Sequence, residues 1–593
     1  MPFDVSPHTL SPHTLPHANG GVRLLRGPGI MMRWAREPAR RGTAPTHSTQ
    51  HTWPARLGVW GVSLILAMPV LSIALLLGQP SDGVWAHLVN TVLTGYIINS
   101  VVLAVGVAIV VAVLGTLSAW FVTMTDLPLR TTLRWGLLLP LAVPAYLVAY
   151  VYTDLLDVYG PLQSWLRAMF GGTVQDWGAP SIRNLPGAIL MFGFVLYPYV
   201  FLLARTAFHD ACGTIQGAGR SLGGSTWRVF CRVTLPMARP AIAAGVFLAV
   251  METLADYGTV EYFGVPTFTT GIYRTWFGMG APIAAAQLAA CLLGVVLLLI
   301  TVELVARGGR RFHALTASAP PDPIALQPAA KVFGLLFCGG LITLGFALPA
   351  GYLVYLAANI GDPLLGHRFI WFITNTITVA AMAAMITVAF ALLTTSLLRA
   401  RDDWANRLAT SMAGMGYAVP GAVIAVGILL PLSTIDDGLE AIYDAMGTVA
   451  PNVFLTGSLA MLVFAYVVRF FAVAQGSVQA GFARISPELD LAARSLGRRQ
   501  PAVTWQIHIP LLRGGLAAAA LLVFVDVAKE LPATMILRPF NFETLALRVY
   551  RLASDERLAE ASTAALLIVM VGIVPVIILS QAASVGQATR QNR

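Results

Sequence analysis

Charge is scarce in this sequence, and lysine is almost missing. Only 11% of the 593 residues are charged, whereas soluble proteins carry about 25%, and the two lysines are Lys331 and Lys529. This deficit excludes an ordinary soluble protein of this length. The 38 Lys and Arg outnumber the 28 Asp and Glu, but the arginines flank apolar runs. We therefore interpret the excess of basic residues as charge that sets the orientation of membrane spans, and we expect no nucleic-acid partner.

Patterns typical of enzymes and metal sites are also missing. The four cysteines, Cys212, Cys231, Cys291 and Cys338, form no CxxC pair and have no metal-ligand spacing. The sequence contains no HExxH, and neither lysine lies in a GxxxxGK[ST] phosphate loop. We predict that the chain is not an enzyme and carries no cofactor of its own, and we assign no metal site firmly.

Long apolar runs dominate the sequence instead. Hydrophobic residues make up 57% of the chain, and about 20 consecutive apolar residues suffice for a helix to cross a bilayer. Counting such runs predicts an all-α integral membrane protein with twelve spans. The expected spans cover residues 57–78, 97–123, 133–155, 185–207, 240–260, 283–306, 331–357, 371–398, 408–432, 451–475, 514–537 and 561–582.

Arginine and lysine are concentrated on alternate connections, which predicts the orientation. The tail 1–56 contains seven arginines, and every even-numbered connection carries two to five Lys or Arg. The odd-numbered connections carry at most two, except for the last, 538–557, which carries four. Because positive residues tend to stay in the cytoplasm, we expect both termini there. The lipid bilayer is then a partner along the whole apolar surface.

The chain contains one unit twice. Residues 220–236, RSLGGSTWRVFCRVTLP, return 274 positions later as RSLGRRQPAVTWQIHIP at 494–510. Earlier in each half the offset is 276, as for Asn99 and Asn375, which we interpret as helix caps. An even number of spans per unit gives both halves the same orientation. We therefore predict two parallel six-helix repeats that enclose a path between them.

The repeat also predicts the domain boundaries. The tripeptide Ala-Val-Pro at 142–144, inside one predicted span, returns at 418–420 inside its counterpart. The polar, Pro- and Ala-rich stretch in mid-chain would join the two halves. The expected parts are an N-terminal tail 1–56, a first half 57–306, a linker 307–330, a second half 331–582 and a C-terminal tail 583–593.

Both copies of the repeated segment lie on connections that we place in the cytoplasm. Gly223 and Gly497 permit a sharp turn, and Pro236 and Pro510 suit the first turn of the following helix. Bulky apolar side chains between them, such as Trp505, need a partner surface. They fit either a helix that docks in a groove of a soluble protein or one that lies among lipid headgroups.

The repeated segments resemble the EAA loops of ABC-importer permeases, whose pattern is Glu-Ala-Ala, three residues, Gly, nine residues, Ile-x-Leu-Pro. The initial Glu is absent here: Gly217 and Leu491 take its place, and Asp490 stands one residue earlier in the second copy. The loops would cover about 208–239 and 480–513. The resemblance implies that the ATPase-coupling residues are Ala218, Gly219, Arg220, Ser221, Leu222, Gly223, Leu235 and Pro236, with Ala492, Ala493, Arg494, Ser495, Leu496, Gly497, Ile509 and Pro510.

A narrower resemblance follows from METLADYGTVEYFGVPTFTTGIYRTWF at 251–277 and AKELPATMILRPFNFETLALRVYRLA at 528–553. These stretches are similar to the fused two-half permeases of ferric-iron importers, and the similarity covers about residues 55–585. It implies the type I ABC importer fold, in the bacterial inner membrane. It also implies a periplasmic ferric-binding protein, and an ATP-binding subunit dimer that holds ATP and Mg²⁺ and docks on both EAA loops.

The predicted spans 5 and 11 carry acidic residues at the same offset, namely Glu252 and Asp256, and Asp526 and Glu530. Carboxylates four residues apart share one face of a helix, and lipid disfavours a lone charge. We therefore place all four on the translocation path, with Lys529 close enough to Asp526 for an ion pair. They would either offer oxygen ligands to a hard trivalent cation or have a structural role at helix ends or in a gate.

Two other functions remain open. An ABC permease for another small solute, such as thiamine or a phosphonate, would share the EAA loops. An ion-coupled secondary transporter would use the carboxylates for protons, but it has no ATPase to dock. The tail 1–56 holds five of the ten histidines. We expect it to be disordered or to precede a true start at Met31 or Met32, with a metal-binding tract as the alternative.

Overall fold

The chain is helical throughout most of the part that the structure describes. A computed structural model describes residues 53–172, 181–221, 226–307, 323–363, 365–400, 403–448 and 455–591. In those ranges the β-structure consists of one isolated bridge between Thr125 and Ile324. Nearly all of the predicted tail 1–56, most of the linker 307–330 and the last two residues lie outside the described residues.

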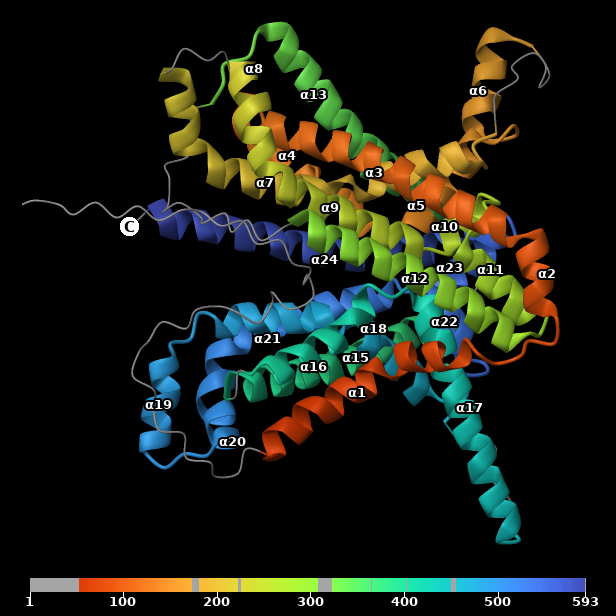
Figure 1. Ribbon diagram of the computed structural model, residues 1–593. Coiled ribbons are helices and arrows are strands. Elements are labelled where there is room, and N and C mark those ends of the chain that lie inside the picture. The colour runs from red at the N-terminus through yellow and green to blue at the C-terminus, as the bar shows by residue number, and fades with distance from the viewer. Residues whose placement is uncertain are drawn as a thin grey trace, which may run out of the picture. The chain divides into compact units, whose positions relative to one another are not determined.

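The helices of the first half form one connected series (Figure 1). They are α1 (Trp53–Leu76), α2 (Val84–Thr91), α3 (Leu93–Met124), α4 (Arg130–Gly136), α5 (Ala145–Leu156), α6 (Pro161–Phe170), α7 (Leu185–Ser221), α8 (Thr226–Val229), α9 (Leu235–Ala255), α10 (Gly258–Tyr262), α11 (Phe268–Tyr273) and α12 (Pro282–Arg307). A 3-10 turn (Leu139–Ala142) precedes α5, and π turns (Phe230–Thr234 and Arg274–Gly278) precede α9 and follow α11.

The second half repeats this series with differences in length. Its helices are α13 (Pro328–Ile342), α14 (Leu348–Asn359), α15 (His367–Ala400), α16 (Trp404–Gly414), α17 (Gly421–Ala445), α18 (Leu459–Phe482), α19 (Pro487–Ser495), α20 (Gln500–Val503), α21 (Ile509–Ala528), α22 (Pro532–Leu537), α23 (Leu545–Ser554) and α24 (Leu558–Gln591). A 3-10 turn (Met415–Tyr417) precedes α17, and π turns (Thr343–Ala347 and Thr504–His508) precede α14 and α21.

The predicted membrane fold is confirmed. Among the described residues, eleven helical segments are long and apolar enough to cross a membrane. A twelfth candidate is a pair of segments, Arg130–Ala142 and Ala145–Phe170, that meet at 90°. The chain is therefore an all-α protein with eleven or twelve spans, as the apolar runs predict.

Two predicted spans are not the continuous helices we expected. Spans 133–155 and 408–432 both break at Ala-Val-Pro, so that α5 begins after Pro144 and α17 begins after Pro420. Proline lacks a backbone N–H and disfavours helical geometry in the residue before it. Val143 accordingly has an extended backbone, with φ −101° and ψ 121°. The same tripeptide thus interrupts the helix at the equivalent place in both copies of the unit.

Other helix ends also differ from the expectation. Pro236 and Pro510 lie in the first turn of α9 and α21, as predicted, but these helices continue from α8 and α20 through π turns without a break. A π turn shifts the hydrogen bonds by one residue, and such a shift accommodates a proline. Helix α24 includes residues 583–591, so most of the predicted C-terminal tail is helical.

The outer helices of each half pack on the opposite half. Helix α1 contacts α15, α16 and α17, while α13 and α14 contact α3, α4 and α5. Arg56 of α1 forms an ion pair with Asp403, the N-cap of α16, at 2.9 Å between Nη2 and Oδ2. In the other direction, Tyr152 of α5 donates a hydrogen bond to the Leu344 carbonyl at 2.6 Å.

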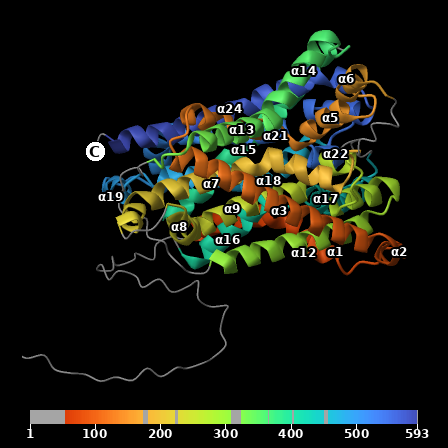
Figure 2. The same ribbon diagram turned by 90° about the horizontal axis from the view of Figure 1, so that it is seen from above.

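This exchange of helices gives two hydrophobic cores, each built from both halves. In Figure 1, α13 lies beside α3 and α4, whereas α1 lies beside α15 and α16. In the view from above, α13, α14 and α24 line one edge and α1 and α12 line the opposite edge (Figure 2). The two repeats are therefore interlocked, and unfolding of one would expose apolar surface of the other.

The repeat is visible in individual contacts as well. Asn99 donates its side-chain N–H to the Pro266 carbonyl at 3.0 Å, and Asn375 does the same to Glu543 at 3.1 Å. Both asparagines lie inside helices, α3 and α15, so the predicted capping role is wrong. The helices begin several residues earlier than expected, at Leu93 and His367, and the amides instead fix the loops before α11 and α23.

Candidate translocation cavity and coupling segments

A cavity of about 100 Å³ lies where the broken helices of the two halves meet. The ends of α9 and α21, the starts of α5 and α22, and residues from α7 and α18 surround it. All five side chains predicted for the translocation path line this cavity. They are Glu252, Asp256, Asp526, Lys529 and Glu530.

Helix breaks put these charged residues at the cavity. Helix α9 ends at Ala255 and α21 ends at Ala528, so the predicted spans 240–260 and 514–537 are each interrupted. Short helices, α10 and α22, then turn away. Non-helical backbone within a membrane protein is tolerated where it lines a cavity or is covered by protein. The breaks therefore create the polar lining that a continuous apolar span could not offer.

Asp256 and Glu530 cap the short helices. Asp256 Oδ1 accepts a hydrogen bond from the Thr259 N–H at 2.8 Å. Glu530 accepts one from the N–H of Ala533 at 2.9 Å and two from Thr534, at 3.1 Å from its N–H and 2.8 Å from its hydroxyl. Our expectation of two carboxylates side by side on one helical face is therefore wrong. Each long helix ends between its two carboxylates. The carboxylate after the end, Asp256 or Glu530, accepts hydrogen bonds from the first N–H groups of the next helix.

Glu252 and Asp526 remain on the helices and differ in their partners. Asp526 Oδ1 lies 3.0 Å from Lys529 Nζ, which is the ion pair that the spacing predicts. In the part of the chain that the structure describes, no hydrogen bond or ion pair is found for Glu252. The described residues also contain no cluster of three or more His, Cys, Asp or Glu arranged to hold a metal ion. The carboxylates thus line the cavity separately.

One cationic residue at the cavity was missed in the sequence. Arg469 of α18 is 8% exposed, and its Nη1 lies 3.9 Å from Glu530 Oε1. From the sequence we place Lys529 alone among the cations beside these carboxylates, because Arg469 lies far from them along the chain. Its position inside the predicted span 451–475 could have indicated this role, because a charged residue within a membrane span usually faces a cavity or a partner.

The two predicted EAA loops, residues 208–239 and 480–513, are called here the first and second coupling segments. The second coupling segment is a helical hairpin. Helix α19 runs from Pro487 to Ser495, so Ala492, Ala493, Arg494 and Ser495 lie on it, and α20 starts at Gln500. Gly497 between them has φ +77°, the left-handed conformation that glycine adopts most easily. The sharp turn predicted at this glycine is therefore confirmed.

Large apolar side chains of this segment face outward. Leu491, Leu496 and Trp505 are 63%, 81% and 71% exposed. Leu491 holds the position at which the EAA pattern has glutamate, and the structure exposes it. Large exposed apolar side chains on an otherwise charged segment are typical of an interaction surface. The geometry accords with a docking surface.

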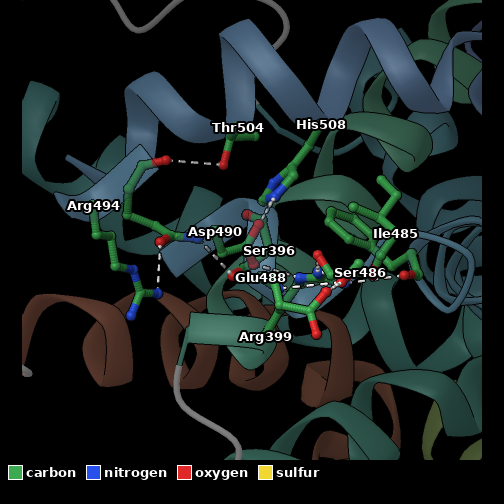
Figure 3. A network of polar contacts seen from close by, with 11 residues as sticks. Ser396, Arg399, Ile485, Ser486, Glu488, Asp490, Arg494, Thr504 and His508 are labelled. Carbon is green, nitrogen blue, oxygen red and sulfur yellow. Dashed lines mark hydrogen bonds and ion pairs between the residues drawn. The ribbon is translucent and has the colours of Figure 1, made fainter. Parts of the chain in front are cut away.

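Asp490 has a different role from the one an exposed glutamate would have (Figure 3). Its Oδ2 accepts a hydrogen bond from Arg399 Nε at 2.6 Å, and its Oδ1 lies 2.8 Å from His508 Nε2. An ionised carboxylate can only accept, so His508 donates from Nε2. Arg399 also donates to the carbonyls of Phe482, Ile485 and Ser486. Asp490 therefore faces the permease interior and joins α19 to α15 and to the π turn before α21.

The charge of Asp490 is retained by this network. Burial raises the pKa of the Asp490 carboxyl. The hydrogen bonds from Arg399 and His508 together lower this pKa by more than burial raises it, so the pKa lies below its ordinary value. Asp490 is 6% exposed and His508 is fully buried. A buried charge is tolerated only when it is paired and hydrogen-bonded. The network meets both conditions.

The first coupling segment is described only in part. Ala218, Gly219, Arg220 and Ser221 form the end of α7, which continues well beyond the predicted span 185–207. Leu222 and Gly223 lie outside the described residues. Leu235 and Pro236 begin α9, as Ile509 and Pro510 begin α21 in the second copy.

Comparisons with known proteins agree with this arrangement. Residues 112–311 match the family described as binding-protein-dependent transport system inner membrane component. The Fe(3+)-transport system permease protein FbpB 2 of Haemophilus influenzae is 24% identical over 496 residues, which cover 82% of this chain and 89% of that protein. The ferric transport system permease protein FbpB of Actinobacillus pleuropneumoniae is 23% identical over 466 residues, covering 75% of this chain and 65% of that protein.

A shorter relative is named for a different cargo. The sulfate transport system permease protein CysT of Escherichia coli is 27% identical over 202 residues, covering 34% of this chain and 70% of that protein. The fold is that of an all-α, multi-pass membrane protein, and residues 112–311 are similar to binding-protein-dependent transport inner membrane components. Over most of its length the chain is similar to proteins named as ferric transport permeases.

Proposed function

We propose that this chain is the permease of a ferric-iron ABC importer. Iron would reach it from a periplasmic binding protein and pass between the two halves through the cavity at the helix breaks. The observation that carries the proposal is the length of the match to proteins named as ferric transport permeases, which extends over both halves. Thiamine, phosphonate and ion-coupled secondary transport find no support among these relatives.

ATP hydrolysis would take place on a separate ATP-binding subunit dimer that holds ATP and Mg²⁺. The sequence has no phosphate loop, and the two coupling segments offer one docking site for each ATPase subunit. The exposed Leu491, Leu496 and Trp505 would fill a groove of that subunit. Both termini would lie in the cytoplasm with the coupling segments, as the distribution of arginine predicts.

Uptake of radiolabelled ferric iron by iron-limited cells tests both the cargo and the coupling. Deletion of the gene should abolish uptake, and the wild-type chain should restore it. A Gly223→Asp, Gly497→Asp double variant should be inserted in the membrane yet fail to restore uptake, whereas Gly514→Ala, in an open position on α21, should restore it. Unchanged uptake after deletion, in cells without a second iron importer, would refute the iron cargo. Parallel assays with labelled sulfate and molybdate would then identify an oxyanion cargo.

A further inference from the structure

The two halves contribute acidic residues equally to the cavity but contribute basic residues unequally. At the offset of 274, Arg469 corresponds to Val195 and Lys529 corresponds to Ala255. All four of these residues line the cavity. Both cations therefore come from the second half, and the first half places apolar side chains at the equivalent positions.

The two cations also differ in how well they are paired. Lys529 is paired with Asp526 at 3.0 Å. Arg469 is paired more weakly, because its Nη1 lies 3.9 Å from Glu530 Oε1 and the Glu530 carboxylate also accepts three hydrogen bonds from the start of α22. Its Nη1 is buried and donates no hydrogen bond to any described residue. A buried guanidinium donor without an acceptor is costly, and it indicates that a ligand supplies the acceptor.

Glu252 stands on the cavity wall contributed by α9 and also has no partner among the described residues. The cavity therefore offers an unpaired carboxylate from one half and an unsatisfied guanidinium from the other. A bare trivalent cation would be attracted by the first and repelled by the second. An anion alone would meet four carboxylates at the same place. A metal ion that carries an anionic ligand satisfies both groups.

Building on the proposed iron cargo, we propose that the cavity binds ferric iron together with a small oxyanion coordinated to it. Glu252 meets the metal side of this complex, and Arg469 donates to the free oxygens of the anion. The planar guanidinium matches carboxylate and phosphate oxygens in a paired geometry. A cavity of about 100 Å³ has room for several water molecules. That size favours phosphate or carbonate over citrate and over a large siderophore.

Double-label uptake by the complete transporter in proteoliposomes tests this proposal. The binding protein is loaded with ⁵⁵Fe(III) in the presence of ³²P-phosphate, ¹⁴C-carbonate or ¹⁴C-citrate, each in a separate experiment. We expect at least one label to enter with iron in a fixed ratio. Arg469→Gln should lower iron uptake at least about tenfold, the loss expected for a charge-assisted hydrogen bond, and Arg469→Lys should restore part of it.

Arg513→Gln is the matched control, because it removes a positive charge from an exposed position of α21. It should transport like the wild type, and all variants should retain the ATPase subunits on purification. Iron entry without any of the three labels would overturn the proposal, whatever the variants do. Entry of an oxyanion without iron would overturn the iron cargo itself, and entry of neither would refute the proposed function, so the two failures are distinguishable.

Discussion

Arg399 of α15 donates its Nε–H to the carboxylate of Asp490 in the second coupling segment, at 2.6 Å. The contact bridges 91 residues of sequence and joins a membrane-spanning helix to the segment that we propose to dock on the ATPase. At the equivalent places the first half has Thr123 and Gln216, which cannot form an ion pair. The residues at these places in the first half therefore cannot repeat the ion pair that anchors the second coupling segment.

Replacement of Asp490 by Asn should weaken the second coupling segment strongly. Arg399 would lose its anionic partner while staying largely buried, and removal of one member of a buried pair costs about 3–5 kcal/mol. We expect lower thermal stability and a lower ratio of iron transported to ATP hydrolysed. Glu488→Gln, on the exposed side of the same helix, is the control. Equal transport-to-ATPase ratios in the two variants would contradict a role for Asp490 in coupling.

The stabilisation by Asp490 should be insensitive to pH over the physiological range. Its pKa lies below the ordinary value in the folded protein, whereas an unfolded Asp titrates near pH 3.9. The contribution is therefore fully present above about pH 4 and is lost as the pH falls through the folded pKa. The melting temperature of the wild type should exceed that of Asp490→Asn by a constant amount from pH 8 to pH 5. A difference that shrinks already near pH 6 would show that a group other than Asp490 controls the network.

Gly497→Ala should impair coupling through the backbone alone. A Cβ at this position would meet no atom within 4 Å, but φ is +77°, and a left-handed conformation costs an L-residue about 1–2 kcal/mol. We expect reduced iron uptake with normal membrane insertion. Gly514→Ala, in open space on helix α21, should leave uptake unchanged, since alanine favours helix. The outcome that would count against this prediction is equal uptake by both variants.

Gly421→Ala should disturb the cavity directly. A Cβ on Gly421 would lie 2.5 Å from Arg469 Nη1 and 2.8 Å from Glu530 Oε1, so one of these side chains must move. Overpacking of this kind costs about 1–3 kcal/mol, and transport should fall more than stability. Gly438→Ala, further along α17 and free of neighbours within 4 Å, is the matched control. Wild-type transport by Gly421→Ala would mean that the positions of these charges do not matter.

Removal of the carboxylate charges tests the path itself. Glu252→Gln keeps the size of the side chain and breaks no contact of the described residues, so any effect on uptake reflects the lost charge. We expect uptake to fall on the order of tenfold, and further in a Glu252→Ala, Asp526→Ala double variant that still assembles. Glu440→Gln removes an exposed charge far along α17 and should have no effect. Unchanged iron uptake by the double variant would remove these carboxylates from the path.

The sequence by itself determined the membrane class, the repeat and the positions of its two copies. These features depend on local properties: the length of an apolar run decides whether it spans a bilayer, and glycine and proline limit the backbone where they stand. Gly497 therefore turns as predicted, and the five charged residues assigned to the path all line one cavity. The constant offset between the two copies of the repeat can likewise be seen in the sequence alone.

Only the tertiary structure decided how the halves interlock and which charges meet. Helix α1 packs on the second half and α13 packs on the first, because apolar surfaces far apart in the chain bury each other. Arg469 belongs to the cavity, and Asp490 faces inward toward Arg399, for the same reason. A side chain's partner across the fold is set by the packing of whole helices, which local periodicity does not encode. Residue spacing therefore predicted the Asp526–Lys529 pair three residues apart, but it could not predict the cation on α18.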